Sequence, residues 1–152
     1  MSPLRRFTTL LALAAAASSI ARAEVPLVSP DKAAARVETG KAVLVDVREP
    51  AEWKDTGVVT TAHTLSLSDL RGPREHWKPF LEANKDVELI LYCRTGNRSA
   101  QAAELLEADG YRVANAGGLS DWVDAGYRTR PHDQPVQPSP SAPQKSHPEP
   151  HP

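Results

Sequence analysis

The sequence predicts an α/β fold in three layers, with a central, mostly parallel sheet of about five strands and helices on both faces. Two observations predict it. Segments 42–47 and 87–92 are apolar at nearly every position, which is typical of parallel strands that are covered on both sides. Segments with strand and helix patterns also alternate along the chain, as they do where right-handed crossovers connect parallel strands.

The N-terminal half of the fold is predicted from helix starts and apolar runs. Ser29-Pro30-Asp31 is a typical helix start, because serine caps a helix and proline suits its first position. This helix is expected to run to about Thr39 and to end at Gly40. The apolar strand at 42–47 follows it. The remaining elements of this half are a short helix at 51–55 that ends at Gly57, a weaker strand at 62–67, and a helix at 68–84 interrupted near Gly72-Pro73.

The C-terminal half carries the stronger signals. After the strand at 87–92, the apolar residues of segment 99–109 recur with a period near 3.6, which predicts a helix that Gly110 ends. Trp77, on the helix before that strand, is expected to be a core anchor. A last strand at 112–116, a turn at Gly117-Gly118 and a helix at 119–125 with Trp122 inward complete the prediction.

The two ends of the chain differ in composition from its middle. Residues 1–23 have a basic start, an apolar stretch at 7–20 and small residues at the end, which predicts a signal peptide cleaved before Glu24. The folded domain is expected at 24–128. The tail at 129–152 is rich in Pro, Gln, Ser and His, and we expect it to be disordered because it has little apolar surface to bury.

Charge and cysteine content limit the classes of function. Residues 1–23 contain three arginines and no acidic residue, so their removal changes the formal charge from −1 to −4. A mildly acidic protein without a basic patch is a poor candidate for nucleic-acid binding. No segment after the signal is apolar enough to span a membrane, so we expect the mature protein to be soluble. The signal peptide predicts a periplasmic or secreted location. In such a compartment the lone Cys93 indicates a free reactive thiol or an intermolecular bridge, although a buried, inert cysteine is the alternative.

The segment Cys93–Ser99 favours the reactive thiol. It lies between a strand and a helix, so the positive end of the helix dipole and the backbone N–H groups of the loop are expected to face the sulfur. Arg94 and Arg98 add permanent positive charge, and Gly96 permits a tightly turned backbone. Nearby cations and helix N-termini lower the pKa of a thiol, so this arrangement predicts a thiolate beside a bound anion.

At four places the sequence resembles the rhodanese superfamily, and the resemblance covers about residues 25–128. One motif of this kind is weak evidence, but four in the correct order are strong. The matching pieces are Asp46–Pro50 with Glu52-Trp53, the loop Cys93–Ser99, Gly110-Tyr111 with Val113, and Gly117–Trp122 with Ala125-Gly126-Tyr127.

The resemblance implies a single-domain exported sulfurtransferase of the thiosulfate type, in which Cys93 takes sulfur from an anionic donor and becomes a persulfide. Cyanide, a thiol or a protein then accepts the sulfur, and neither a metal nor an organic cofactor is required. Arg94 and Arg98 would bind the donor, and Arg98 would also close the loop. Asp46 and Arg48 would support the site, although a structural ion pair explains them equally well. The residues implied to bind substrate are Arg94, Thr95, Gly96, Asn97, Arg98 and Ser99.

Loop length separates functions within the superfamily. The loop from Cys93 to Arg98 has the form Cys-x₄-Arg, which the resemblance associates with sulfur transfer. Loops longer by one residue resemble phosphatases and arsenate reductases, and a reductase also needs a second thiol. A further alternative is a non-turnover sulfur carrier or partner-binding module whose tail, 129–152, recruits partners.

Segment 57–63 departs from the superfamily pattern, which commonly has a Gly-His-Ile-x-Gly-Ala-like stretch here. The histidine and the second glycine of that pattern are absent from their usual places, and His63 resembles a displaced general base. A general base is one interpretation of His63, and a strand or surface histidine is the preferred one.

Overall fold

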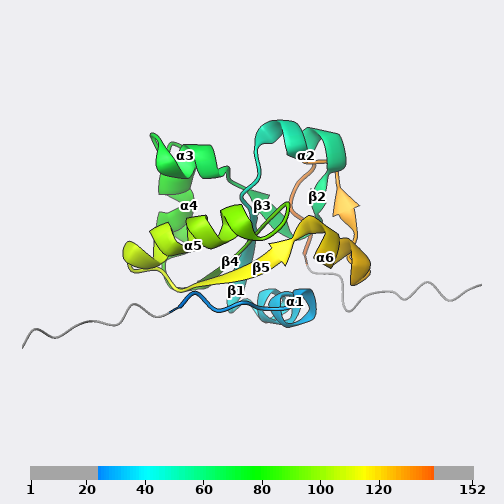
Figure 1. The fold of residues 1–152 in the computed structure, drawn as a ribbon, viewed down its shortest axis with the longest axis horizontal. Coiled ribbons are helices and arrows are strands. Elements are labelled where there is room, and N and C mark those ends of the chain that lie inside the picture. The colour runs from blue at the N-terminus through cyan, green and yellow to red at the C-terminus, as the bar shows by residue number, and fades with distance from the viewer. Residues whose placement is uncertain (1–23, 139–152) are drawn as a thin grey trace, which may run out of the picture.

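The computed structural model describes residues 24–138, which form the α/β fold expected from the sequence (Figure 1). The central sheet has four parallel strands in the order β3-β1-β4-β5, and a separate antiparallel pair is formed by β2 and β6. The elements in chain order are α1 Pro30–Glu38, β1 Ala42–Asp46, α2 Pro50–Thr56, β2 Val58–Val59, β3 Ala62–Thr64, α3 Leu67–Arg71, α4 Trp77–Ala83, β4 Glu88–Cys93, α5 Asn97–Ala108, β5 Val113–Gly118, α6 Leu119–Asp124 and β6 Thr129–Arg130.

Helices cover both faces of the sheet. One core cluster joins α3, α4 and α5 to one face, and a second joins α1 and α6 to the other (Figure 1). Trp77 of α4 and Trp122 of α6 are fully buried, one in each cluster, which confirms both as core anchors. Because both faces are covered, the strands are apolar along their length rather than at alternate positions.

The sheet differs from the prediction at its two edges. The strand expected at 62–67 ends at Thr64, because Ser66 leaves the sheet and accepts a hydrogen bond from the backbone N–H of Asp69 as the N-cap of α3. At the other edge Leu27 forms a single parallel bridge to Asn115 of β5. The central sheet therefore has four strands, and not about five.

The folded part of the chain continues past residue 128, the end of the domain expected from the sequence. Thr129 and Arg130 form β6 against β2, and the backbone N–H of Gln137 donates to the carbonyl of Thr60 at 3.0 Å. The short strand β2 itself was not predicted. The expected signal peptide, and the tail beyond residue 138, lie outside the described residues.

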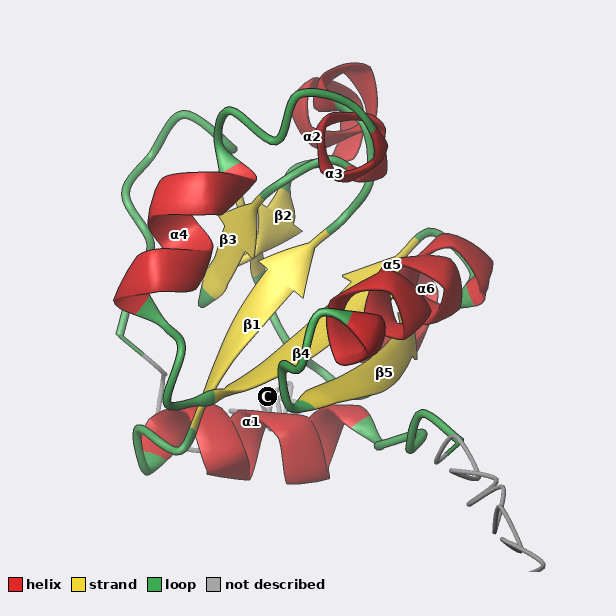
Figure 2. Cartoon of the chain, turned by 90° about the vertical axis from the view of Figure 1, so that its left-hand side faces the viewer, coloured by secondary structure: helices red, strands yellow, loops and turns green. Residues whose placement is uncertain are grey.

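The carboxyl ends of β1 and β4 lie side by side, because these strands are parallel and pair from Ala42 with Glu88 to Asp46 with Tyr92. Figure 2 shows the arrowhead of β1 pointing toward the loop that leads to α2. In open α/β sheets this edge is where ligands bind. Within residues 24–138 no helix is long and apolar enough to cross a membrane.

Candidate functional site

Cys93 is the last residue of β4 and is completely buried. The chain then turns through Gly96, which has φ +89° in the left-handed region and precedes the first turn of α5. Helix α5 begins at Asn97, two residues earlier than predicted, so its N-terminal N–H groups belong to the loop itself. The loop is thus a turn from strand to helix that encloses the sulfur.

Two opposing effects act on the Cys93 thiol. Burial by itself raises its pKa, because desolvation disfavours the thiolate. Hydrogen bonds from the Ser99 hydroxyl and from the backbone N–H groups of Ser99, Thr95 and Gly96 act in the other direction, and the net pKa of Cys93 is lowered. The Gly96 N–H lies 3.1 Å from Sγ and the Ser99 Oγ lies 3.5 Å from it. These contacts agree with the donors expected from residues 94–99.

Asn115 of β5 holds the loop in place, a role that was not predicted from the sequence. Its Nδ2 donates to the Gly96 carbonyl at 3.0 Å, and its Oδ1 accepts from Ser99 Oγ at 2.8 Å and from the Gly117 N–H at 3.1 Å. The sequence signal was a lone polar residue in a strand of small and apolar residues. Asn115 therefore positions Ser99 beside the sulfur.

The glycine pair at the end of β5 lets the loop pack closely against the sheet. A Cβ on Gly118 would lie 2.5 Å from the carbonyl oxygen of Arg94, a distance that real Cβ atoms do not adopt. Gly96 in turn approaches Gly117, whose Cα would lie 3.3 Å from a Cβ on Gly96. The sequence predicted a turn here, whereas β5 continues through Gly118.

Arg98 is engaged by Glu52 of α2. Its two terminal nitrogens donate to the two carboxylate oxygens of Glu52 at 2.6 and 2.7 Å, which is a bidentate pair. The hydrogen bond from Arg98 is the main cause that lowers the pKa of Glu52 to about 2. Arg98 therefore ties the loop to α2.

Arg94, in contrast, is exposed at the start of the loop. Among residues 24–138 no hydrogen bond or ion pair engages its guanidinium. Thr95 and Asn97 are exposed on either side of the half-buried Gly96. Of the two arginines expected to receive an anion, Arg94 is the one that is free to do so.

Asp46 and Arg48 form a buried ion pair, with 2.7 Å between Arg48 Nη2 and Asp46 Oδ2. Arg48 also donates to the carbonyl of Gly57 at 2.6 Å and to the hydroxyl of Thr56 at 2.8 Å. Burial alone lowers the pKa of Arg48, but its bonds to Asp46 raise it overall. The pair therefore holds the C-terminal end of α2, the helix that carries Glu52, which agrees with the structural interpretation.

His63 lies in β3, two strands away from β4, at the level of Val45 and Leu91. Burial is the main cause that lowers its pKa, and its ring packs 5.1 Å from that of Phe80. These facts agree with a strand histidine. Among residues 24–138 no group of three His, Cys, Asp or Glu is arranged to hold a metal ion.

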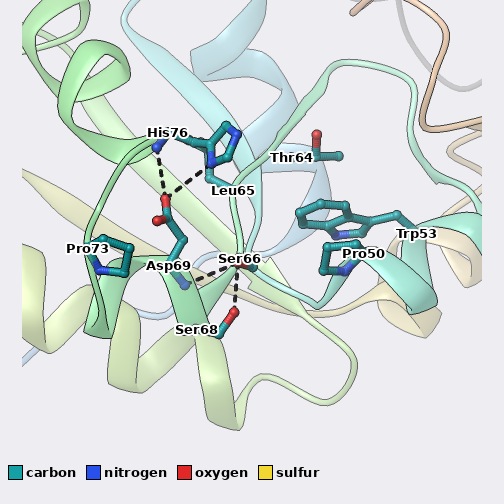
Figure 3. Close-up of a pocket in the computed structure, with 9 residues that line it drawn as sticks. All are labelled: Pro50, Trp53, Thr64, Leu65, Ser66, Ser68, Asp69, Pro73 and His76. Atoms are coloured by element: carbon teal, nitrogen blue, oxygen red, sulfur yellow. Dashed lines mark hydrogen bonds and ion pairs between the residues drawn. The ribbon is translucent and has the colours of Figure 1, made fainter.

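Two cavities flank α2 at the carboxyl edge of the sheet, and a third, of about 620 Å³, lies against Thr95, Gly96 and Asn115. One, of about 520 Å³, lies beside the loop and is lined by Arg94 and Thr95 together with residues of α2 and α6. The other, of about 510 Å³, lies between Trp53 and His76 and contains no residue of the loop. Figure 3 shows Asp69, which lines this second cavity, with its carboxylate near His76 and its backbone N–H hydrogen-bonded to Ser66. Asp69 there caps α4 by accepting from three backbone N–H groups, so its carboxylate is already used.

Comparison with known proteins agrees with this geometry. The family model described as a rhodanese-like domain matches residues 29–125. A sulfurtransferase of Allochromatium vinosum is 37% identical over 93 residues, which cover 59% of this chain and 78% of that protein. The putative mitochondrial thiosulfate sulfurtransferase of Schizosaccharomyces pombe is 35% identical over 95 residues, covering 54% of this chain and 63% of the relative. This chain thus spans slightly less than two thirds of the fission yeast protein.

Among solved structures, the human single domain sulfurtransferase TSTD1 matches with a TM-score of 0.54 and 26% identity. The match covers 66% of this chain and 96% of the human chain, so almost the whole human protein corresponds to the folded part described above.

Proposed function

The chain belongs to the rhodanese-like domain family, and from this premise we propose that it is a sulfurtransferase that moves sulfane sulfur through a persulfide on Cys93. The proposed donor is thiosulfate or a similar anion, and the proposed acceptor is a thiol, a protein or cyanide. The observation that carries the proposal is the Cys93 sulfur enclosed by N–H and O–H donors at the start of a helix. Such a setting lowers the pKa of a thiol and stabilises negative sulfur.

In the first half-reaction the Cys93 thiolate attacks the outer sulfur of thiosulfate. The Sγ–S bond forms as the S–S bond of thiosulfate breaks, and sulfite leaves with the electron pair of that bond. The outer sulfur remains on Cys93 as a persulfide anion, so charge is conserved without a proton. Free Arg94, at the edge of the loop, provides the positive charge that attracts the donor anion.

In the second half-reaction an acceptor thiolate or cyanide attacks the outer sulfur of the persulfide. The bond between the two sulfurs breaks, and Cys93 leaves as the thiolate that began the cycle. This two-step covalent scheme uses no metal and no organic cofactor. The loop donors Thr95, Gly96 and Ser99 hold the sulfur anion in both forms.

The loop geometry favours sulfur transfer over phosphate chemistry. A phosphatase loop must direct its closing arginine at a tetrahedral oxyanion. Here both terminal nitrogens of Arg98 are bonded to Glu52, and the loop is the short Cys-x₄-Arg form. Phosphate-ester hydrolysis that depends on Cys93 would contradict this part of the proposal.

The test is mass spectrometry of the intact protein after treatment with thiosulfate. We expect one added sulfur atom on wild type, removed by cyanide with release of thiocyanate, and none on Cys93→Ser. The serine variant keeps the size and the hydrogen-bonding capacity of the side chain, so circular dichroism should show the same fold. Equal thiosulfate:cyanide transfer by the two proteins would overturn the proposal.

A further inference from the structure

The cavity beside the reactive loop has a definite pattern of charge and apolar surface. Arg94 and Thr95 of the loop form one wall, the end of α2 forms a second, and α6 forms a third. The cavity measures about 520 Å³, which suits a small molecule rather than a bare sulfur anion alone. Thr95, whose backbone N–H is one of the donors to Cys93, lines this cavity, so a ligand bound there lies against the loop that encloses the sulfur.

The apolar part of this cavity comes from α6. Val123 is 50% exposed and is one of three large apolar side chains exposed among residues 24–138. Half-buried Leu119, one turn earlier on the same helix, lines the cavity with it. Together they offer a short hydrocarbon surface, wide enough for the alkyl part of a small ligand.

Three charged side chains of the cavity remain without a partner among the residues that the structure describes. Its other two charged residues are engaged, since Glu52 is paired with Arg98 and Arg48 with Asp46. The remaining three are Arg94, Asp55 and Asp124, for which residues 24–138 provide no hydrogen bond or ion pair.

The positions of the two free carboxylates are unfavourable for the fold itself. Asp55 lies in the last turn of α2 and Asp124 is the last residue of α6. A negative charge at a helix C-terminus is repelled by the helix dipole, so neither aspartate is explained by helix stability. Both, however, face the same cavity as the reactive loop.

We propose that this cavity binds the sulfur acceptor, and that the acceptor is a small thiol carrying an ammonium group, held by Asp55 and Asp124. The inference rests on the proposed function and specifies its acceptor. Arg94 serves the donor anion. The alkyl stem of the acceptor packs on Val123.

The transfer step conserves atoms and charge. The acceptor enters as a thiolate and forms a bond to the outer sulfur of the Cys93 persulfide. The bond from that sulfur to Cys93 Sγ breaks, the acceptor leaves as its own persulfide anion, and Cys93 returns to the thiolate. An ammonium group favours this step because it lowers the pKa of its own thiol and reduces the repulsion between two sulfur anions.

The test compares three acceptors with the same two-carbon stem: cysteamine, 2-mercaptoethanol and 3-mercaptopropionate, which carry an ammonium, a hydroxyl and a carboxylate. Thiosulfate is the donor, and kcat/KM is expressed per acceptor thiolate at fixed ionic strength. We expect the order cysteamine, 2-mercaptoethanol, 3-mercaptopropionate, with about fivefold between neighbours, as for an exposed ion pair. Equal values for the three acceptors would overturn the inference.

Variants of the two aspartates test whether the preference for cysteamine arises from this cavity. In the double variant Asp55→Asn/Asp124→Asn the ratio of cysteamine to 3-mercaptopropionate should approach one, and in Asp124→Lys it should fall further. Asp86→Asn, at an exposed aspartate two residues before β4, is the matched control and should keep the wild-type ratio. An unchanged ratio in the double variant would overturn the role of the aspartates.

Failure of this inference is distinguishable from failure of the proposed function. Sulfur loading of wild-type Cys93 by thiosulfate, with turnover by cyanide, tests the function without any aminothiol. Loading with no aminothiol preference would reject the inference alone, whereas absence of loading would reject the function itself.

Discussion

The Cys93 thiolate is stabilised by the hydroxyl of Ser99, which has several hydrogen-bond acceptors within reach. Ser99 Oγ carries one hydrogen, and besides Sγ it lies 2.8 Å from Asn115 Oδ1 and 3.0 Å from the Gly96 carbonyl. A negative sulfur attracts this hydrogen more strongly than either neutral oxygen. The hydroxyl therefore stabilises the charged form of Cys93 more than the neutral thiol.

The first prediction concerns Ser99→Ala. Loss of a donor to the thiolate should raise the pKa of Cys93 and slow its alkylation by iodoacetamide several-fold near neutral pH. The check is the pH dependence of the alkylation rate in wild type and variant. In denaturant, where the loop is lost, the two proteins should titrate alike. A midpoint unchanged by Ser99→Ala would show that the backbone donors alone stabilise the thiolate.

The second prediction concerns Glu52→Gln. The pKa of Glu52 is lowered to about 2, so its contribution to stability is present above its ordinary pKa of 4.5 and is lost as the pH falls toward 2. The variant should be less stable by about 1 kcal/mol near neutral pH, because the pair is partly exposed. This difference should shrink on acidification. Urea unfolding at several pH values measures it.

The exposed Glu75→Gln is the control for this comparison, since its side chain has no hydrogen bond or ion pair within residues 24–138. It should show little difference in unfolding free energy at any pH. If Glu52→Gln differed from wild type by the same amount in acid as at neutrality, the Arg98 pair would not be the ionic link inferred above.

Among the elements, β5 determines how close the loop can approach the sheet. A methyl group on Gly118 would meet the Arg94 carbonyl at 2.5 Å, so Gly118→Ala must displace the loop that encloses the sulfur. We expect this variant to lose sulfur loading and to be destabilised by about 1–3 kcal/mol. Loading is measured by mass spectrometry and stability by urea unfolding.

Gly110→Ala is the matched control for the loop. Gly110 also has a positive φ, of +93°, but a Cβ there would meet nothing within 4 Å. This variant should be destabilised by about 1 kcal/mol through backbone strain and should keep its loading. Loss of loading in both variants would indicate a general effect of stability and not the contact at Gly118.

The pairing of β6 with β2 depends on a buried arginine. Arg130 donates to the carbonyls of Thr60 at 3.0 Å, of Ala62 at 2.6 Å and of Gln134 at 2.6 Å. The Arg130 side chain thus holds segment 130–134 against residues 60–62, and its hydrogen bonds go to neutral carbonyls.

The fourth prediction is that Arg130→Met lowers the free energy of unfolding by about 2–3 kcal/mol, since several buried carbonyls lose their donor. Arg128→Met makes the same chemical change two residues earlier at an exposed side chain and should have little effect. Urea unfolding measures both. Equal effects of the two substitutions would show that Arg130 is dispensable for the fold.

For the whole molecule, we propose export with cleavage before Glu24. Residues 1–23 have the layout of a signal peptide, and the chain is held by the fold from Pro26, whose carbonyl accepts from the Asn115 N–H at 2.9 Å. Protein isolated from the periplasmic fraction should therefore begin at Glu24, as N-terminal sequencing or intact mass would show. Full-length protein confined to the cytoplasm would contradict the proposal.

The sequence alone determined the fold class and the position of the thiol. Continuous apolar runs identified β1 and β4, because strands covered on both faces leave a local pattern. The loop Cys93–Ser99 was recognisable for a similar reason, since a cysteine, a glycine and two arginines between a strand and a helix are neighbours in the chain. The expected helices and core tryptophans depended on the same kind of local signal.

Only the tertiary structure decided what each of these side chains contacts. Arg98 is 46 positions from Glu52, and nothing local distinguishes its paired guanidinium from the free one of Arg94. Asn115 and Arg130 likewise act through partners distant in the chain. Such contacts arise when strands far apart in the sequence become neighbours in the sheet. The sequence therefore located the reactive sulfur, and the packing of the sheet determined which charges remain free around it.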